Sequence, residues 1–308
     1  MIPMKILVIG GTGHLGANIV EILCSQGHQV TAATRGNKGK PTHACIDKAR
    51  LITLNSSDLE AVTALSEQEH FDVVVDIPGT AWNVWQAFRD KASHIVACGS
   101  LWMLGYPHMV PTPEQTQGYC PSAGYRARYE KIQEMLADSF THKAVFTAVF
   151  PPNICGPGKI PLDTLGGRDI EVHKANMRGE VVYLPNGPEV LLGPCDAYDL
   201  ATLFTLAINN RTAAAGQIFN GGSEYALTAT EFVNTLAEIH GVEIPIAYVP
   251  WDEYQKKISP DVGYWWHFYA HMCPDISKAK KLLGYKPRYT PQETLARAVQ
   301  WMHDTGLL

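Results

Sequence analysis

Residues 5–16 read KILVIGGTGHLG, an apolar run that leads directly into spaced glycines. The glycines form a G-x-x-G-x-x-G pattern, and the apolar residues after it recur at helical spacing until Gly27, a suitable helix C-cap. Glycines let the backbone approach a pyrophosphate, and a helix that begins here offers free N–H groups to its charge. The stretch therefore predicts a strand, a dinucleotide-binding loop and a helix. We expect the loop's coenzyme contacts from Gly10, Thr12, Gly13, His14, Leu15 and Gly16.

Composition places the chain among ordinary globular proteins. Its 308 residues are 46% hydrophobic and 18% charged, and the net charge is −5 at pH 7. An acidic balance argues against a basic nucleic-acid surface, and no apolar run reaches the length of a membrane span. The first residues enter a strand instead of a signal peptide, and the seven cysteines lack C-x-x-C spacing. We therefore expect a cytoplasmic protein with reduced thiols, a small-molecule substrate, no bound metal and no membrane contact.

Strand-like runs alternate with helix-like stretches through the first half of the chain. The runs predicted as strands are 5–9, 29–33, 51–54, 72–77, 94–98 and 144–150. Strands separated by helical patterns imply right-handed crossovers and a parallel sheet. We predict an α/β fold, namely a doubly wound parallel sheet of the Rossmann type with a smaller C-terminal substrate-binding lobe. The dinucleotide-binding domain would take residues 1–155 with a return segment near 190–222, and the lobe would take mainly 156–308.

Later helices carry recognisable start and end signals. Thr228 with Glu231, and Thr290 with Glu293, have the spacing of capping boxes. Gly284 is placed to end a short helix that follows residue 275. These signals predict three helices in the last third of the chain.

Six motifs together resemble the extended short-chain dehydrogenase/reductase family, the NAD-dependent epimerase/dehydratase group. The resemblance covers about residues 5–301. It rests on the glycine loop and on stretches similar to that family's motifs, in the same order, at 71–76, 153–158, 199–201, 218–222 and 275–287. It implies a nicotinamide coenzyme at the glycine loop and chemistry at a hydroxyl or carbonyl carbon of a small molecule. It is also compatible with a homodimer built on the helix that carries Tyr125.

The end of the second predicted strand indicates which coenzyme binds. Where an NAD site commonly has Asp or Glu, this chain has Thr34 followed by Arg35. An arginine beside a neutral hydroxyl suits a 2′-phosphate, so NADP is favoured over NAD, with Lys38 and Lys40 close enough to assist. By position in the family, further coenzyme contacts are expected from Asn55, Pro78, Gly79, Pro152 and Asn153.

The family's catalytic residues are matched only in part. Ser100 follows the fifth predicted strand, where the family has its hydroxyl donor, and Tyr125 follows it at a spacing that the family uses. In the family, Tyr-x-x-x-Lys supplies the acid/base, and the lysine lowers the pKa of that tyrosine. Here Tyr129 stands in the lysine's place, and Arg128, one position earlier, could supply positive charge. The candidate catalytic residues are Ser100, Tyr125 and Arg128.

The missing lysine leaves three hypotheses open. The enzyme is active with Tyr125 assisted by Arg128 and the oxidised nicotinamide charge, or it catalyses reduction with another proton donor such as Ser100 or a pocket histidine. In the third, it is catalytically degenerate and binds NADP as a regulatory or scaffold protein. An atypical branch that resembles the chloroplast stem-loop-binding proteins has a similar Thr-Arg-Gly turn and also departs from Tyr-x-x-x-Lys. The acidic charge argues against nucleic-acid binding here.

Tryptophans mark the predicted substrate side. Trp82 follows the fourth strand, Trp102 and Met103 follow the fifth, and Trp266 lies in an aromatic run at 264–268. They would wall a pocket that stacks a ring, although the run at 264–268 is more typical of packing between lobes. The stretch 191–196 replaces a basic pattern of many sugar-nucleotide enzymes. This argues against a nucleotide-sugar substrate and leaves the substrate open.

Overall fold

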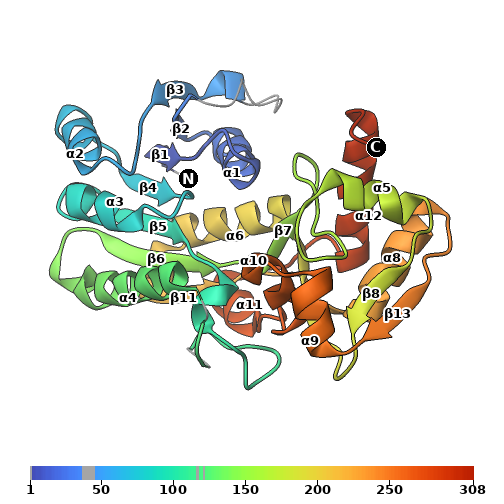
Figure 1. Cartoon of the computed structure of the whole chain (residues 1–308). Helices are drawn as coiled ribbons and strands as arrows, with labels where there is room; N and C mark the ends of the chain where they lie inside the picture. The colour runs from blue at the N-terminus through green and yellow to red at the C-terminus, as the bar shows by residue number, and fades with distance from the viewer. Residues whose placement is uncertain (1, 37–45, 116–117, 121) are drawn as a thin grey trace.

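The computed structural model describes residues 2–36, 46–115, 118–120 and 122–308 (Figure 1). Its centre is a seven-stranded sheet in the order β11-β6-β5-β4-β1-β2-β3, in which every neighbouring pair is parallel. This confirms the predicted doubly wound α/β fold. The strands of this sheet are β1 (Lys5–Ile9), β2 (Gln29–Thr34), β3 (Arg50–Thr53), β4 (Val73–Asp76), β5 (His94–Cys98), β6 (Val145–Phe150) and β11 (Gln217–Asn220).

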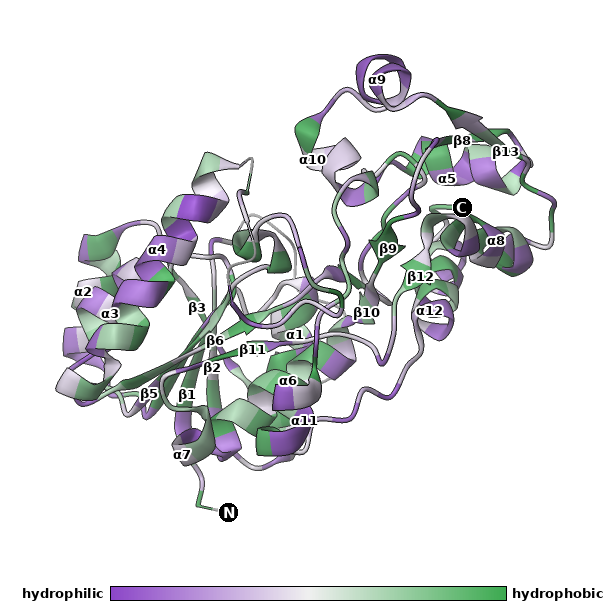
Figure 2. Ribbon diagram, turned by 90° about the horizontal axis from the view of Figure 1, so that it is seen from below, coloured by the Kyte–Doolittle hydropathy of each residue, from purple (hydrophilic) through white to green (hydrophobic). Residues whose placement is uncertain are grey.

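Both faces of the sheet are covered, which explains why its strands lack polar alternation. Ile6 and Val8 pack in a core with α1, α6 and α11, whereas Leu7 and Ile9 pack in a second core with α2, α3 and α4. Figure 2 shows these two groups of helices on opposite sides of the sheet. The helices are α1 (His14–Ser25), α2 (Leu59–Gln68), α3 (Ala81–Phe88), α4 (Ala123–Asp138), α5 (Ile170–Met177), α6 (Ala197–Asn209), α7 (Arg211–Ala214), α8 (Ala229–His240), α9 (Trp251–Glu253), α10 (Val262–Trp265), α11 (Ser277–Leu283) and α12 (Pro291–Asp304).

The chain leaves the sheet after β6 and returns to it later. β10 (Pro194–Asp196) pairs with β7 (Asn153–Cys155) and leads into α6, and β11 then adds an edge strand beside β6. Of these elements, β10, α6 and β11 fall within the segment 190–222, whereas β7 precedes it. A further return, which the sequence reading did not include, is α11, whose Ala279 and Leu283 share the apolar core of α1.

The remaining elements form a second group, which Figures 1 and 2 show set apart from the central sheet. β8 (Val182–Pro185) pairs with β13 (Ile246–Val249), and β9 (Leu191–Leu192) pairs with β12 (Leu227–Thr228). A third apolar core joins them to α8 and α12 and includes the buried rings of Phe232, Tyr254 and Phe268. This group is the smaller C-terminal lobe.

Two helices of the lobe begin at the predicted caps. The Thr290 side chain accepts a hydrogen bond from the Glu293 N–H, and the Glu293 carboxylate accepts one from the Thr290 N–H, so α12 has a complete capping box. At α8 the Thr228 hydroxyl accepts from the Glu231 N–H at 3.1 Å. Such caps satisfy N–H groups that the helix itself leaves unpaired.

No helix in the described ranges is long and apolar enough to cross a membrane. The same part of the chain holds no group of three His, Cys, Asp or Glu side chains arranged as metal ligands. Six cysteines are described, all of them free thiols. Burial raises the pKa of the Cys98 and Cys155 thiols to about 12, so these side chains act as small apolar groups.

Candidate functional site

The glycine loop lies where the strand order reverses between β1 and β4, the usual ligand position in open α/β sheets. Gly10 has φ +80, a backbone conformation that favours glycine, and a Cβ on Gly16 would clash with the Gly10 carbonyl. Gly13 begins α1 without a side-chain cap, and the first turn of the helix contains no acidic residue. The free N–H groups and positive end of α1 therefore suit a pyrophosphate.

A cavity of about 310 Å³ opens beside this loop at the carboxyl ends of β1, β2 and β3. Thr34 and Arg35 reach it from the end of β2, and the Arg35 side chain is exposed. Thr34 and Arg35, which the sequence predicts to favour NADP, thus lie at the same cavity as the glycine loop. Lys38 and Lys40 lie outside the described residues. The full lining is Ile9, Gly10, Thr12, Gly13, Ala33, Thr34, Arg35, Leu54, Ser56, Ser57, Pro78 and Thr80.

Seven of the thirteen predicted coenzyme residues do not line this cavity, namely His14, Leu15, Gly16, Asn55, Gly79, Pro152 and Asn153. Asn55 is exposed and its side-chain oxygen accepts from the Ser57 N–H, so the serines after it take its place. The Leu15 side chain is buried in the core beneath α1, because it is on the helix face that packs on the sheet. His14 lies against the second lobe, where a Cβ on Gly158 would meet its ring at 3.2 Å.

A buried carboxyl shapes the turn after β4. Asp76 is fully buried, and its oxygens accept from the Thr80 hydroxyl at 2.6 Å and from the Gly79 N–H at 3.1 Å. Burial raises the pKa of Asp76 to about 6, against the opposing effects of these hydrogen bonds and of the Arg128 charge. Asp76 therefore fixes the Pro78–Gly79 turn at the coenzyme crevice, a role that the sequence reading missed.

Arg128 reaches this turn from α4. Its guanidinium lies so close to Gly79 that a Cβ there would clash with it, and Nη2 is 3.4 Å from the Cys98 carbonyl oxygen. The same guanidinium is 5.6 Å from the centre of the Tyr125 ring. Tyr129, in the family's lysine position, packs its ring edge on Phe150 instead. The positive charge beside Tyr125 is thus supplied by Arg128.

Ser100 and Tyr125 are brought together by Trp102. Ser100 begins the short 3₁₀ helix Leu101–Leu104, and its hydroxyl accepts from the Trp102 N–H at 3.3 Å. The Trp102 ring lies 5.3 Å from the Tyr125 ring and 5.1 Å from the His267 ring, between centroids. The two lobes meet here, since Trp102 belongs to the sheet domain and His267 to the lobe.

Of the predicted substrate residues, Trp102 alone lies partly open beside Ser100 and Tyr125. Met103 is 2% exposed and Trp266 is 3% exposed, so both are core residues. The Trp266 indole N–H is buried and has no hydrogen-bond partner within the described part of the chain. Trp82 lies on α3, where the Lys131 ammonium is 4.1 Å from its ring centre. The prediction of Met103 and Trp266 as pocket walls is not supported by this packing, because both side chains are buried in the apolar core beside the sheet.

Pro152 and Asn153, predicted as coenzyme contacts, lie at the joint between the lobes. The Asn153 side-chain oxygen accepts from the Gly193 N–H at 3.1 Å, and its nitrogen lies 3.0 Å from Nδ1 of His267. Asn153 thus already has protein partners on both sides of its amide. His267 is the functional candidate that sequence reasoning did not single out. Its position within the aromatic run 264–268 was the available signal.

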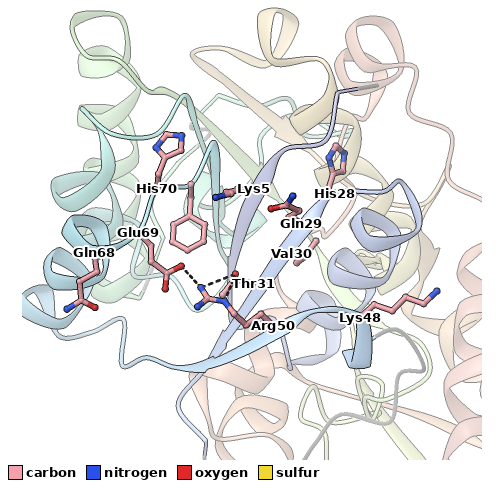
Figure 3. Close-up of a pocket in the computed structure, with 11 residues that line it drawn as sticks. Lys5, His28, Gln29, Val30, Thr31, Lys48, Arg50, Gln68, Glu69 and His70 are labelled. Carbon is pink, nitrogen blue, oxygen red and sulfur yellow. Dashed lines mark hydrogen bonds and ion pairs between the residues drawn. The ribbon is translucent and has the colours of Figure 1, made fainter.

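A larger cavity, about 620 Å³, lies at the opposite, amino end of the strands (Figure 3). Arg50, at the start of β3, is bonded there to Glu69 and Thr31. Lys5 and Lys48 also line it. The coenzyme cavity described above is the better active-site candidate, because ligands of open parallel sheets bind beyond the carboxyl ends of the strands.

Comparisons with known proteins agree with this geometry. Residues 6–81 match the model of the NAD dependent epimerase/dehydratase family. The chloroplast stem-loop binding protein of 41 kDa b of Arabidopsis thaliana is 28% identical over 312 residues, covering 94% of this chain and 77% of that protein. A dTDP-6-deoxy-L-talose 4-dehydrogenase (NAD(P)(+)) of Kitasatospora kifunensis is 26% identical over 315 residues, covering 95% and 94%.

A solved structure has the same fold over its full length. It is the UDP-glucose-4-epimerase of Stenotrophomonas maltophila with bound NAD and formylated UDP-arabinopyranose, with a TM-score of 0.76, 17% identity, and coverage of 98% of this chain and 99% of that one. The family match covers the glycine loop, and the relatives extend the similarity over nearly the whole chain. The chain is thus similar to the NAD-dependent epimerase/dehydratase family, the extended short-chain dehydrogenases/reductases, through the family model at residues 6–81 and through relatives over nearly its full length.

Proposed function

We propose that this protein is an NADP-dependent oxidoreductase or epimerase-like enzyme that acts on a hydroxyl or carbonyl carbon of a small molecule. A bound nicotinamide coenzyme would supply hydride transfer. The tight turn of the loop, in which a Cβ on Gly16 would clash with the Gly10 carbonyl, and the uncapped start of α1 support coenzyme binding. Ser100 would polarise the substrate oxygen, and Tyr125 would hold or release its proton.

The observation that carries the proposal is the position of Arg128. Its guanidinium lies on the Gly79 turn and near the Tyr125 ring, on the side of α4 that faces the coenzyme crevice. A fixed cation there favours negative charge developing on a tyrosine or substrate oxygen. Arg128 therefore supports turnover with Tyr125 as acid/base over a catalytically degenerate, binding-only protein.

The preference for NADP over NAD is part of the proposal. Arg35 borders the cavity next to Thr34, and none of the described residues that line this cavity carries a carboxylate that would repel a 2′-phosphate. Fluorescence titrations with NADPH and NADH test this directly. Tighter NADPH binding is expected, and equal affinities would remove the argument from Arg35.

Turnover is tested with a Tyr125→Phe variant and a panel of carbonyl and hydroxyl compounds. Loss of turnover with unchanged NADPH binding is expected, because only the acid/base group is removed. Undiminished turnover would exclude Tyr125 from the mechanism. A cytoplasmic location and a homodimer through the α4 helix complete the proposal, and size-exclusion chromatography with light scattering tests the dimer.

A second candidate is nucleic-acid binding, favoured by one observation. A relative is named a chloroplast stem-loop binding protein, and the cavity in Figure 3 is lined by the cations of Lys5, Lys48 and Arg50 against the single carboxylate of Glu69. Backbone phosphates would bind such a groove with strong salt dependence. Titration of a labelled stem-loop RNA at two salt concentrations decides it, and salt-independent or absent binding would exclude it.

A further inference from the structure

The lobe contributes one polar ring to the predicted active centre. His267 lies in the short 3₁₀ helix Trp266–Phe268, and its ring is 5.1 Å from the ring of Trp102, which in turn contacts Tyr125. The proposed mechanism assigns no catalytic or binding role to this imidazole. Its hydrogen bonds determine which of its ring nitrogens can donate to a ligand.

The hydrogen-bond network assigns the tautomer of His267. The Gly193 N–H can only donate, so the Asn153 oxygen must accept it, and the Asn153 nitrogen must then face the histidine. That nitrogen can only donate, so Nδ1 of His267 accepts. A second backbone bond, from the Asn153 N–H to the Gly193 carbonyl at 3.2 Å, holds the two residues in register. The proton of the neutral ring is therefore on Nε2.

Nε2 of His267 is free to donate to a ligand. Among the described residues it has no hydrogen-bond partner, and it is not one of the polar atoms sealed from solvent. The Trp102 ring lies against the imidazole in a tilted arrangement, with the ring planes 59° apart. A donor held in this way, next to the aromatic surface of Trp102, suits an oxygen atom on an uncharged part of a ligand.

We propose that Asn153 holds His267 as the neutral Nε2–H tautomer, and that this N–H donates a hydrogen bond to a hydroxyl or carbonyl oxygen of the substrate. The inference rests on the proposed function and adds a substrate contact to it. The proton stays on Nε2 throughout, so His267 orients and polarises an oxygen and transfers nothing.

The electrostatic environment supports a neutral ring. Burial, with a smaller contribution from the Arg168 charge, lowers the pKa of His267 to about 3. The ring is then uncharged at physiological pH and has no acidic proton to give. Of the proton donors considered from sequence, a pocket histidine is thereby disfavoured at this position, and Tyr125 and Ser100 remain.

Histidine ¹⁵N NMR tests the tautomer with or without coenzyme. In the wild-type protein, His267 should show the neutral Nε2–H pattern between about pH 5.5 and 8.5. In Asn153→Asp, a carboxylate would accept from Nδ1, so the proton should move to Nδ1 or the ring should become an imidazolium. An imidazolium or an Nδ1–H ring in the wild type would overturn the proposal.

The substrate contact is tested with three probes, UDP-glucose, D-glucose and dihydroxyacetone, each added to the protein with NADPH. At least one should shift the Nε2 resonance of His267, and no shift with any of them would refute the contact. For a probe that is turned over, His267→Asn should lower kcat/KM about 2- to 13-fold, the effect of one neutral hydrogen bond. His267→Gln, which keeps a donor near the Nε2 position, should restore most of it.

His271→Asn is the matched control. His271 lies in the same segment and also accepts a hydrogen bond through Nδ1, from the Leu191 N–H at 3.1 Å, without contacting Trp102 or Tyr125 in the described structure. Equal losses in the His267 and His271 variants would indicate a structural effect and overturn the proposal. Absence of NADPH binding would instead refute the proposed function, while the tautomer of His267 is still measured on its own.

Discussion

Replacement of Gly79 by Ala should displace Arg128 and weaken coenzyme binding. Gly79 has φ +87, and an added Cβ would collide with the Arg128 guanidinium. The backbone conformation alone should cost about 1–2 kcal/mol of folding free energy. The collision has a second effect, which is to displace the Arg128 guanidinium and so to weaken coenzyme binding. We expect the Arg128 guanidinium to donate a charge-assisted hydrogen bond to the bound coenzyme. Such a bond contributes about 1.5–3 kcal/mol, so its loss should raise the Kd for NADPH about 10- to 150-fold.

A double-mutant cycle separates these two effects. In an Arg128→Ala background the guanidinium is absent, so Gly79→Ala should still destabilise the fold but leave the Kd for NADPH unchanged. Gly241→Ala is the control for backbone strain, because Gly241 has φ +66 at the end of α8 with open space around it. Urea unfolding and NADPH fluorescence give the two readouts. Additive effects of the two substitutions on the Kd would refute the assigned contact.

Three further predictions concern charge and capping. Arg35→Ala should weaken NADPH binding about tenfold or more and leave NADH binding unchanged, as measured by parallel fluorescence titrations. Burial, with a smaller effect of Arg211, lowers the pKa of His94 to about 3. As the pH falls, the unfolded chain therefore binds this proton before the folded protein does, and the free energy of unfolding should fall by about 1.4 kcal/mol per pH unit for this residue below about pH 6.5. The urea unfolding midpoint, measured between pH 7 and 5, should depend less on pH in His94→Asn than in the wild type. The same pH dependence in both proteins would contradict this. Thr290→Ala removes the cap of α12 and should cost about 1 kcal/mol in urea unfolding, with no change in NADPH affinity.

The sheet was predictable because its strands are short apolar runs, and these runs alternate along the chain with segments of helical spacing. Residues 5–9 and 94–98 were predicted with the bounds that β1 and β5 have in the structure. The strands β9 and β12 have only two residues each, which is too short for a recognisable apolar run, and they depend on pairing with each other. Local sequence determines a strand that is buried on both faces, but not a short pair that forms through tertiary contact.

The cavity beside the glycine loop was predictable to the level of the loops that line it, but not of every side chain. Thr34 and Arg35 line the expected cavity, whereas Ser56 and Ser57 line it in place of Asn55, because turn geometry decides which residue after β3 faces inward. Hydrogen bonds between residues far apart in sequence set a second limit on prediction, as Asn153 shows. Its partners Gly193 and His267 lie far away in sequence, and only the folded chain shows that its amide is already hydrogen-bonded.

The return of α11 to the sheet has a consequence for biosynthesis. The apolar face under α1 gains its Ala279 and Leu283 only after most of the polypeptide has been made, and the edge of β6 stays unpaired until β11 emerges. A ribosome-bound fragment that ends near residue 155 would thus expose an unpaired strand edge and an apolar surface, and both features promote aggregation. We therefore expect the sheet domain to complete its folding only with the rest of the chain, with chaperone dependence during translation and low solubility of truncated versions.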